Sequence, residues 1–157
     1  MAELLEHMEQ NPGFVHYLQQ VPLDDSMDDL LDDAKTVEVF DASRARSIDL
    51  WYSQRGSRLP LHWDRSDNIF AQARGTKEVV CYSPEQSEFL YPGRGDAQFA
   101  SQIDLDAPDL ERFPEFRNAV PSGPLQVNAG DLLLIPKRWW HRINTISDRS
   151  VTLTYWL

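Results

Sequence analysis

The chain has 157 residues, a net charge of −10 and a single cysteine, Cys81. A chain of this length usually forms one domain with its own core, so we expect residues 1–157 to be a single domain. One cysteine permits no internal disulfide and no cysteine-based zinc site, which makes a reducing, cytoplasmic location the expectation. The excess of 25 acidic over 15 basic residues argues against nucleic-acid binding, and no apolar run is long enough to span a membrane.

The first 35 residues predict a helical lead-in. Apolar residues recur at helical spacing over residues 2–10, Pro12 interrupts the pattern, and the spacing resumes over residues 12–20. Residues 24–33 then place six aspartates around three apolar residues. This pattern favours a short amphipathic helix with a solvated acidic face, although an acidic rim for a cationic substrate would look the same.

Residues 36–157 change from helical spacing to strict alternation. Short segments rich in branched and aromatic residues are separated by turns that contain glycine or proline, which predicts seven or eight strands. The clearest of these segments are Val37–Val39, Ile48–Tyr52, Ile69–Ala71, Val79–Tyr82, Leu132–Ile135 and Val151–Trp156. Residues 107–116 predict a helical turn between prolines. The fold class is therefore mainly β, a small β-sandwich or a double-stranded β-helix with a jelly-roll (cupin) core behind a helical lead-in.

Two of the four histidines have neighbours that suit a metal ion. His62 and Asp64 lie two residues apart, so in a strand both side chains point to the same face. His141 follows a predicted strand near the end of the chain. Two histidines and one carboxylate are the ligand set of non-haem Fe(II) oxygenases, which leave the opposite face of the metal open. A buried histidine beside a surface aspartate explains the same pattern without a metal, and we expect only a structural or surface role for His7 and His16.

Lys77 is the second residue that suggests chemistry, because the chain contains only three lysines. Iron needs a two-electron donor to activate oxygen in this chemistry, and the usual donor is 2-oxoglutarate, whose distal carboxylate requires a cation. A lysine where a barrel strand opens can reach inward as that point charge, whereas a solvated turn lysine is the simpler interpretation. Asn68 and Gln72 share strand parity with the two candidate ligands and could line the same cavity.

Several blocks of sequence, in order along nearly the whole chain, carry a family resemblance. They read HYLQQVPLDD, LHWDRSDNIFAQARGTKEVVCYSPEQSEFLYP, SQIDLDAPDLERFPEF, AGDLLLIPKRWWHRI and SVTLTYW. Together they resemble the JmjC-type, cupin-like Fe(II)/2-oxoglutarate oxygenases. Within that family they are most similar to the small JmjC-only protein hydroxylases, such as the asparaginyl hydroxylase that inhibits hypoxia-inducible factor.

The resemblance implies a role for individual residues. Fe(II) would be bound by His62, Asp64 and His141, and these three residues would form the catalytic centre. The residues implied to contact 2-oxoglutarate are Lys77, for its distal carboxylate, with Asn68, Tyr17 and Thr154. Trp156 would border the active site.

The sequence departs from the family pattern at three places. Leu59 stands where relatives carry a serine or threonine that helps to hold the cosubstrate. The loop before SQID reads DAQFA, which does not support specificity for asparagine. The chain ends directly after the last predicted strand, without the C-terminal helices that dimerise the asparaginyl hydroxylase, so we expect a monomer or a small homo-oligomer of another kind.

Three functions remain open from the sequence. The first is a hydroxylase that acts on a side chain of a protein or peptide, and the negative charge suits a basic one. The second is the same chemistry on a small molecule or a natural-product peptide precursor. The third is a non-catalytic, metal-binding cupin, which the intact triad and Lys77 argue against.

Overall fold

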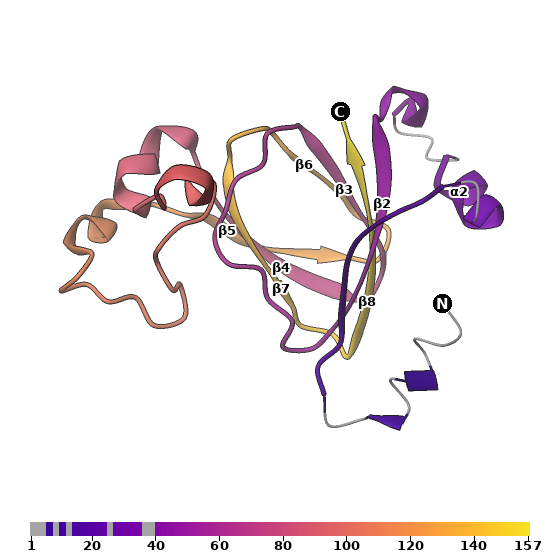
Figure 1. The fold of residues 1–157 in the computed structure, drawn as a ribbon, viewed down its shortest axis with the longest axis horizontal. Coiled ribbons are helices and arrows are strands. Elements are labelled where there is room, and N and C mark those ends of the chain that lie inside the picture. Colours follow the sequence, from indigo (N-terminus) through magenta and orange to yellow (C-terminus); the bar gives the residue numbers. More distant parts are fainter. Residues whose placement is uncertain (1–5, 8–9, 12–13, 25–26, 36–39) are drawn as a thin grey trace.

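In the described part of the chain, eight short strands form two antiparallel sheets that face each other across a barrel interior (Figure 1). The computed structural model describes the whole chain except residues 1–5, 8–9, 12–13, 25–26 and 36–39. The larger sheet has the order β1-β2-β8-β3-β6 and the smaller sheet the order β5-β4-β7. The strands are β1 (Tyr17–Pro22), β2 (Ser47–Gln54), β3 (Asn68–Arg74), β4 (Thr76–Tyr82), β5 (Ser122–Asn128), β6 (Leu132–Ile135), β7 (Trp140–Thr145) and β8 (Arg149–Trp156).

Alternation along the strands separates an outer apolar face from an interior that carries the polar residues. On β2, Ile48 and Leu50 belong to an outer hydrophobic cluster, whereas the next residue, Trp51, lines the interior cavity. The same division continues on β8, where Tyr155 packs outward and Thr154 inward. Because side chains alternate across a strand, the register of β2 with β8 fixes which polar groups meet inside the barrel.

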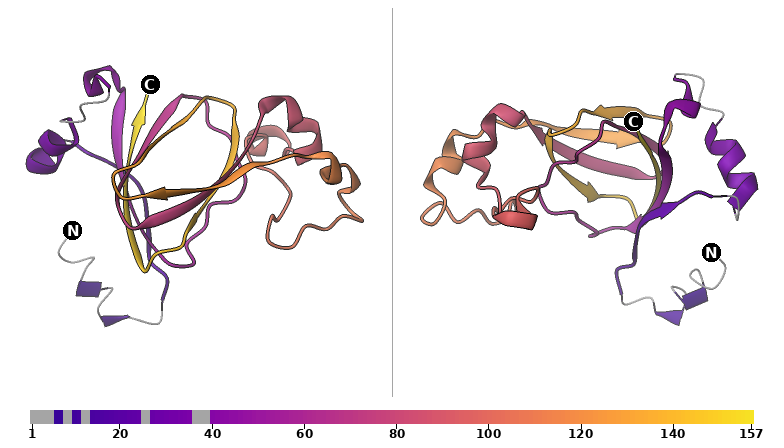
Figure 2. Two further views of the ribbon diagram at one scale, coloured as in Figure 1. Left: turned by 180° about the vertical axis from the view of Figure 1, so that it is seen from behind. Right: turned by 45° about the horizontal axis from the view of Figure 1, so that its top comes forward.

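A helical layer covers the outer face of the larger sheet (Figure 2). Helix α2 (Asp28–Lys35) places Leu31 and Ala34 against Ile48 and Tyr155, and the Tyr155 hydroxyl donates to the carbonyl of Ala34 at 2.7 Å. A short 3-10 turn, η2 (Ala42–Arg44), follows. No helix in the described part of the chain is long and apolar enough to cross a membrane.

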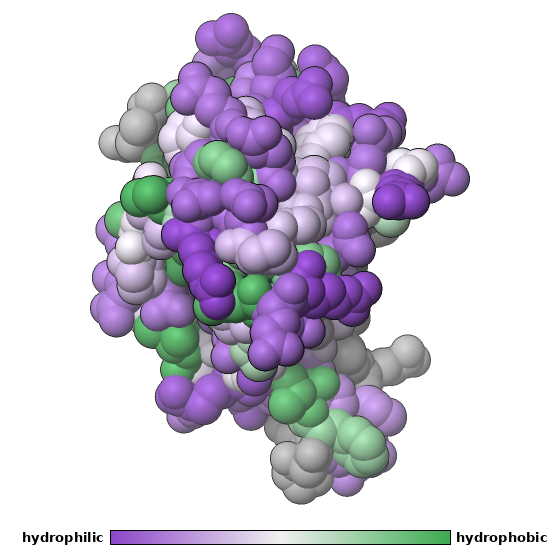
Figure 3. All heavy atoms as spheres, turned by 90° about the vertical axis from the view of Figure 1, so that its left-hand side faces the viewer, coloured by the Kyte–Doolittle hydropathy of each residue, from purple (hydrophilic) through white to green (hydrophobic). Residues whose placement is uncertain are grey.

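The long connection between β4 and β5 projects from the opposite side of the barrel (Figures 1 and 2). It contains the 3-10 helices η3 (Pro84–Leu90), η4 (Gly95–Ala97) and η5 (Pro114–Asn118). Its Leu90 packs with Leu61 and Trp140 in a cluster separate from the one under α2. The surface on this side is mainly hydrophilic, with smaller hydrophobic areas between (Figure 3).

The structure confirms the mainly β fold class and corrects three details. Residues 17–20, expected to be helical, lie in β1, because pairing with the edge of β2 outweighs a weak local periodicity. Strands β5 and β7 lie outside the segments predicted to be strands. The helical turn expected over residues 107–116 lies slightly later, at η5. The predicted strand Val37–Val39 lies outside the described residues.

Candidate active site

The three predicted metal ligands come together at one end of the barrel, although they lie far apart in the sequence. His141 is on β7, and His62 forms an isolated bridge with it instead of belonging to a regular strand. Their backbones exchange two hydrogen bonds, from His62 N to the His141 carbonyl at 3.1 Å and in return at 2.7 Å. Asp64 follows two residues after His62, so the bridge brings all three side chains to one face.

The ligand atoms are spaced for a shared cation. The Asp64 carboxylate lies 3.3 Å from Nε2 of His141 and 4.0 Å from Nε2 of His62. One ligand atom from each residue lies within 4.8 Å of the others. Ligands held roughly 2 Å from one ion on a single face stand about 3 Å apart, so only a small contraction would close this set around a metal.

Backbone carbonyls fix the tautomer of both histidines. Nδ1 of His62 lies 2.8 Å from the carbonyl oxygen of Pro60, and Nδ1 of His141 lies 3.0 Å from that of Trp139. A carbonyl can only accept, so each Nδ1 must carry the proton and donate it. Each Nε2 therefore keeps its lone pair for a metal, the arrangement that orients histidine ligands in metalloproteins.

The charges at the site suit a divalent cation. Burial lowers the pKa of His62, and repulsion from His141 lowers it further, so that His62 is neutral near pH 7. For Asp64, burial by itself raises the pKa, but whenever the imidazoles are protonated, hydrogen bonding and attraction from His141 and attraction from His62 outweigh it, and the net shift is downward. A neutral imidazole beside an ionised carboxylate is the state that binds a metal.

A cavity of about 290 Å³ extends from these ligands into the barrel, and Lys77 lies in its wall. Lys77 is on β4 instead of in the preceding turn, and only 2% of it is exposed. Burial lowers its pKa to about 8, and its Nζ lies 5.3 Å from the centre of the Phe70 ring. No acidic group of the described residues offsets that burial, so the ammonium is placed for an anion that enters the cavity.

The other predicted cosubstrate contacts line the same cavity. Asn68 is 3% exposed, and its Oδ1 has no hydrogen-bond partner among the described residues. The Thr154 hydroxyl accepts a hydrogen bond from Nε1 of Trp51 at 2.8 Å. Burial raises the pKa of Tyr17, which therefore stays a neutral donor at the cavity wall. Buried polar atoms without partners are rare in folded proteins, and Asn68 offers such an open acceptor at the cavity wall.

One expectation about the cavity changes with the structure. Gln72 does not reach it and is instead hydrogen-bonded to Ser150 and Thr152 deeper in the barrel. Of the five tryptophans of the chain, Trp51 and Trp156 line the cavity. The other three, Trp63, Trp139 and Trp140, pack in the hydrophobic clusters.

The structure adds cavity residues that sequence reasoning had not singled out. Gln19 and Gln20 line it from β1, where the register with β2 shifts between Leu18 and Val21 and Gln20 has a φ of +49°. A bulge of this kind re-aims side chains, often beside active sites. In the sequence, both glutamines belong to the Tyr-Leu-Gln-Gln segment, which is part of the family resemblance. Phe99, 45% exposed, stands at the mouth.

Comparison with known proteins agrees with this architecture. Residues 1–157 match the family described as "Cupin-like domain". The chain is 30% identical over 150 residues to human "HSPB1-associated protein 1", covering 92% of this chain and 30% of that protein. It is 34% identical over 111 residues to "Lysine-specific demethylase 8" of Xenopus tropicalis, covering 70% and 25%. With "JmjC domain-containing protein D" of Dictyostelium discoideum it shares 35% identity over 103 residues, covering 64% and 23%.

The chain belongs to the cupin-like domain family, and the resemblance to its JmjC-type members is confirmed. The chain spans no more than about a third of the length of these relatives.

Proposed function

We propose that the chain is an Fe(II)- and 2-oxoglutarate-dependent oxygenase that hydroxylates a side chain of a protein or peptide. The observation that carries the proposal is one cavity with a two-histidine, one-carboxylate cluster at its end and a buried lysine, Lys77, in its wall. Either feature alone occurs in proteins without this activity. Their combination matches a metal and an anionic cosubstrate in one pocket.

The residues fit both groups. His62, Asp64 and His141 would hold Fe(II), since both Nε2 lone pairs and the ionised carboxylate face one point. Lys77 would pair with the distal carboxylate of 2-oxoglutarate, while Asn68, Tyr17 and Thr154 offer polar atoms along the same wall. When bound, iron and 2-oxoglutarate supply the activation of oxygen that side chains cannot provide.

The chain's own contribution is positioning and exclusion of water. The carbonyls of Pro60 and Trp139 hold the imidazole rings in orientation, so the ligand set is preorganised. Trp51 and Trp156 restrict the cavity and limit solvent access to the reacting carbon. The Trp156 indole is itself fixed by a 2.7 Å hydrogen bond to the Asp49 carboxylate.

Hydroxylation and demethylation both begin with a hydroxyl group being placed on a carbon atom, and the two outcomes differ in which carbon receives it. A hydroxyl group placed on an N-methyl carbon leaves with it as formaldehyde, whereas one on another carbon is retained. The name of the Xenopus relative includes a lysine demethylase activity. For this chain we propose retention of the hydroxyl, and the same chemistry on a small molecule or natural-product peptide precursor is the second candidate because the cavity measures only about 290 Å³.

The test is succinate formation from 2-oxoglutarate with Fe(II), in the unaltered chain and in Asp64→Ala, with mass spectrometry of candidate peptides and metabolites. A gain of one oxygen on a peptide supports the proposal. Loss of a methyl group with formaldehyde would make the chain a demethylase, and a gain confined to metabolites would favour the second candidate. If the unaltered chain binds Mn(II) yet forms no succinate with any substrate, the chain is a non-catalytic, metal-binding cupin.

A further inference from the structure

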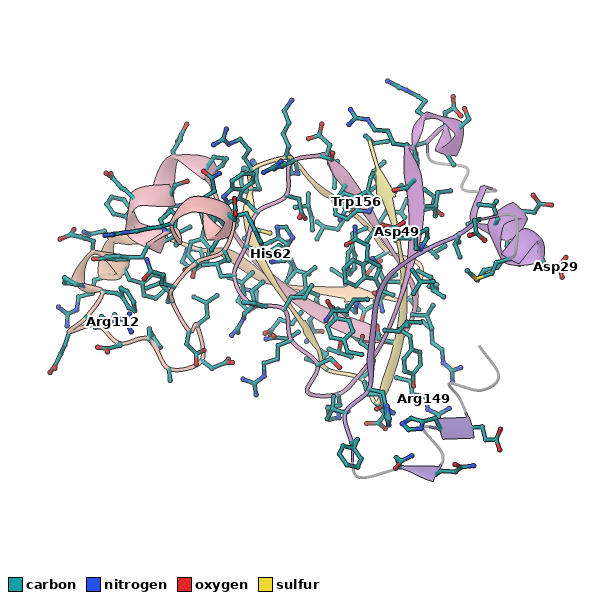
Figure 4. The ribbon with its side chains drawn as sticks, in the orientation of Figure 1. Asp29, Asp49, His62, Arg112, Arg149 and Trp156 are labelled. Atoms are coloured by element: carbon teal, nitrogen blue, oxygen red, sulfur yellow. The ribbon has the colours of Figure 1, made fainter. Side chains whose placement is uncertain are left out.

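A groove of about 320 Å³ adjoins the active-site cavity. Three residues line both hollows: Gln20, Asp64 and Trp156. Asp49 and Trp156 lie at the same end of the barrel as His62, and Arg149 lies at the other (Figure 4). A substrate chain with one side chain in the cavity would therefore place its neighbouring residues along this groove.

The charged side chains of the groove are mostly cationic. Arg46 and Arg65 line it, and both are exposed. Its one acidic residue, Asp64, is a candidate metal ligand, and its remaining lining residues are neutral. Neither arginine forms an ion pair with an acidic group in the described part of the chain, although Arg55, Arg58 and Arg142 elsewhere do.

The loops around the metal ligands extend this positive character. The backbone nitrogen of Arg138 donates to the carbonyl of Asp64 at 2.8 Å, and its guanidinium lies over the Trp63 ring at 5.1 Å. The nearby acid, Asp67, accepts a 2.7 Å hydrogen bond from the backbone of Lys137. Acidic residues gather elsewhere, for example on α2, whose Asp29 lies beyond the larger sheet from His62 (Figure 4).

We propose that this groove binds an acidic segment of the peptide substrate, in which Arg46 and Arg65 pair with carboxylate side chains beside the residue that enters the cavity. The planar guanidinium matches a carboxylate in two parallel hydrogen bonds, which gives register as well as attraction. The inference rests on the proposed function and narrows its substrate class. It differs from the basic substrate expected from the net charge of −10, because charges beyond roughly 8 Å are screened at physiological salt.

Short labelled peptides of equal length test the groove, with glutamate, lysine or serine at the same positions around an invariant centre. Fluorescence anisotropy is measured on the protein loaded with Mn(II) and 2-oxoglutarate. We expect the glutamate peptide to bind most tightly. Arg46→Glu and Arg65→Glu should each weaken it roughly tenfold, because attraction becomes repulsion in an exposed pair. Arg149→Glu is the matched control, with the same change of net charge at the other end of the barrel, and should change affinity less than about twofold.

Equal or tighter binding of the lysine or serine peptide, or no binding of the glutamate peptide, overturns the inference. So does an equal loss in Arg149→Glu, since net charge alone would then explain it. A single-stranded oligonucleotide that binds more tightly than the glutamate peptide would assign the groove to nucleic acid instead. Failure of the unaltered chain to bind Mn(II) and 2-oxoglutarate refutes the proposed function, whereas intact binding of both without preference for the glutamate peptide refutes the groove alone.

Discussion

Both ends of the barrel interior are lined with polar residues, but one end pairs them with one another more completely than the other. Away from the metal ligands, Nε2 of Gln72 donates to the Ser150 hydroxyl at 2.8 Å, and its Oε1 accepts from Thr152 at 2.8 Å. The hydroxyls of Ser53 and Thr145 lie 2.7 Å apart. We call these five residues the paired network. Its members satisfy one another, so it needs no ligand.

The cavity end leaves several polar groups open. Oδ1 of Asn68 has no partner among the described residues, and the charge of buried Lys77 is uncompensated there. Two Nε2 atoms converge beside the Asp64 carboxylate. On β3 the change from an open to a paired group occurs between Asn68 and Gln72. The comparison teaches that the two ends differ in how completely their polar atoms are paired, not in polarity itself.

The largest expected effect is at the cavity end, where a substitution should strongly weaken metal binding with little change in the stability of the fold. Asp64→Ala should weaken Mn(II) binding by at least about a hundredfold, since it removes the only anionic ligand. The free energy of unfolding should change by less than about 1 kcal/mol, because this carboxylate is partly exposed and, among the described residues, pairs only with His141 and His62. Isothermal titration with Mn(II) and urea denaturation measure the two effects.

Asp148→Ala is the matched control for that change, because its carboxylate is 90% exposed and pairs with Arg55 outside the barrel. It should leave Mn(II) binding as it was. Retained Mn(II) affinity in Asp64→Ala would show that the ion binds elsewhere, and the division of the barrel into two ends would lose its main support.

The reverse result is expected at the paired network. Gln72→Leu leaves the hydroxyls of Ser150 and Thr152 buried without this partner, which should cost about 3 kcal/mol of unfolding free energy. Mn(II) affinity should stay the same. Urea denaturation measures the loss, and Gln126→Leu, an exposed position on β5, should stay within about 0.5 kcal/mol. A similar loss in both variants would contradict a special role for the network.

Alternation and residue scarcity predicted which residues face inward, but not how deep they lie. Asn68 and Gln72 have the same parity, and only the register of β3 with β8 places the first at the cavity and the second in the network. Lys77 was distinctive because the chain has few lysines, and the family resemblance gave the metal ligands. The burial of Lys77 depends on β7, which is far away in the sequence.

The missed strands have similar causes. The spacing of apolar residues in residues 12–20 fits a helix, and only hydrogen bonding to β2 makes Tyr17–Pro22 a strand. Strand β5 begins within a sequence that contains two prolines and a glycine, residues that usually mark a turn. Long-range pairing decides both segments, and no local pattern contains that information.

A smaller effect is expected at Lys77, where one substitution should weaken 2-oxoglutarate binding and increase the stability of the fold. Lys77→Met should weaken 2-oxoglutarate binding by about thirtyfold, because the distal carboxylate loses its charged partner. The same change should stabilise the ligand-free chain by about 2 kcal/mol, since a desolvated ammonium is replaced by an apolar side chain of similar size. Titration calorimetry and urea denaturation measure both. Lys137→Met, at an exposed position, is the control and should change neither the 2-oxoglutarate affinity nor the free energy of unfolding. A Lys77→Met chain that is less stable than the unaltered chain would contradict the view that the buried ammonium lacks a partner at the cavity end.

The smallest effect is a pH dependence with a defined sign. The Lys77 pKa is lowered to about 8 by burial, and only the protonated ammonium attracts a carboxylate. Below that pH most molecules carry the charge, so 2-oxoglutarate affinity should be level. Above it, the affinity should fall by up to about tenfold per pH unit, because binding must first return a proton to the amine. Tyr17 does not interfere, since burial raises its pKa away from this range.

Calorimetry between about pH 7 and about pH 9 should show the fall in the unaltered chain and a flat profile in Lys77→Met. A fall that persists in that variant would assign the titration to another group and leave the buried ammonium without a part in binding.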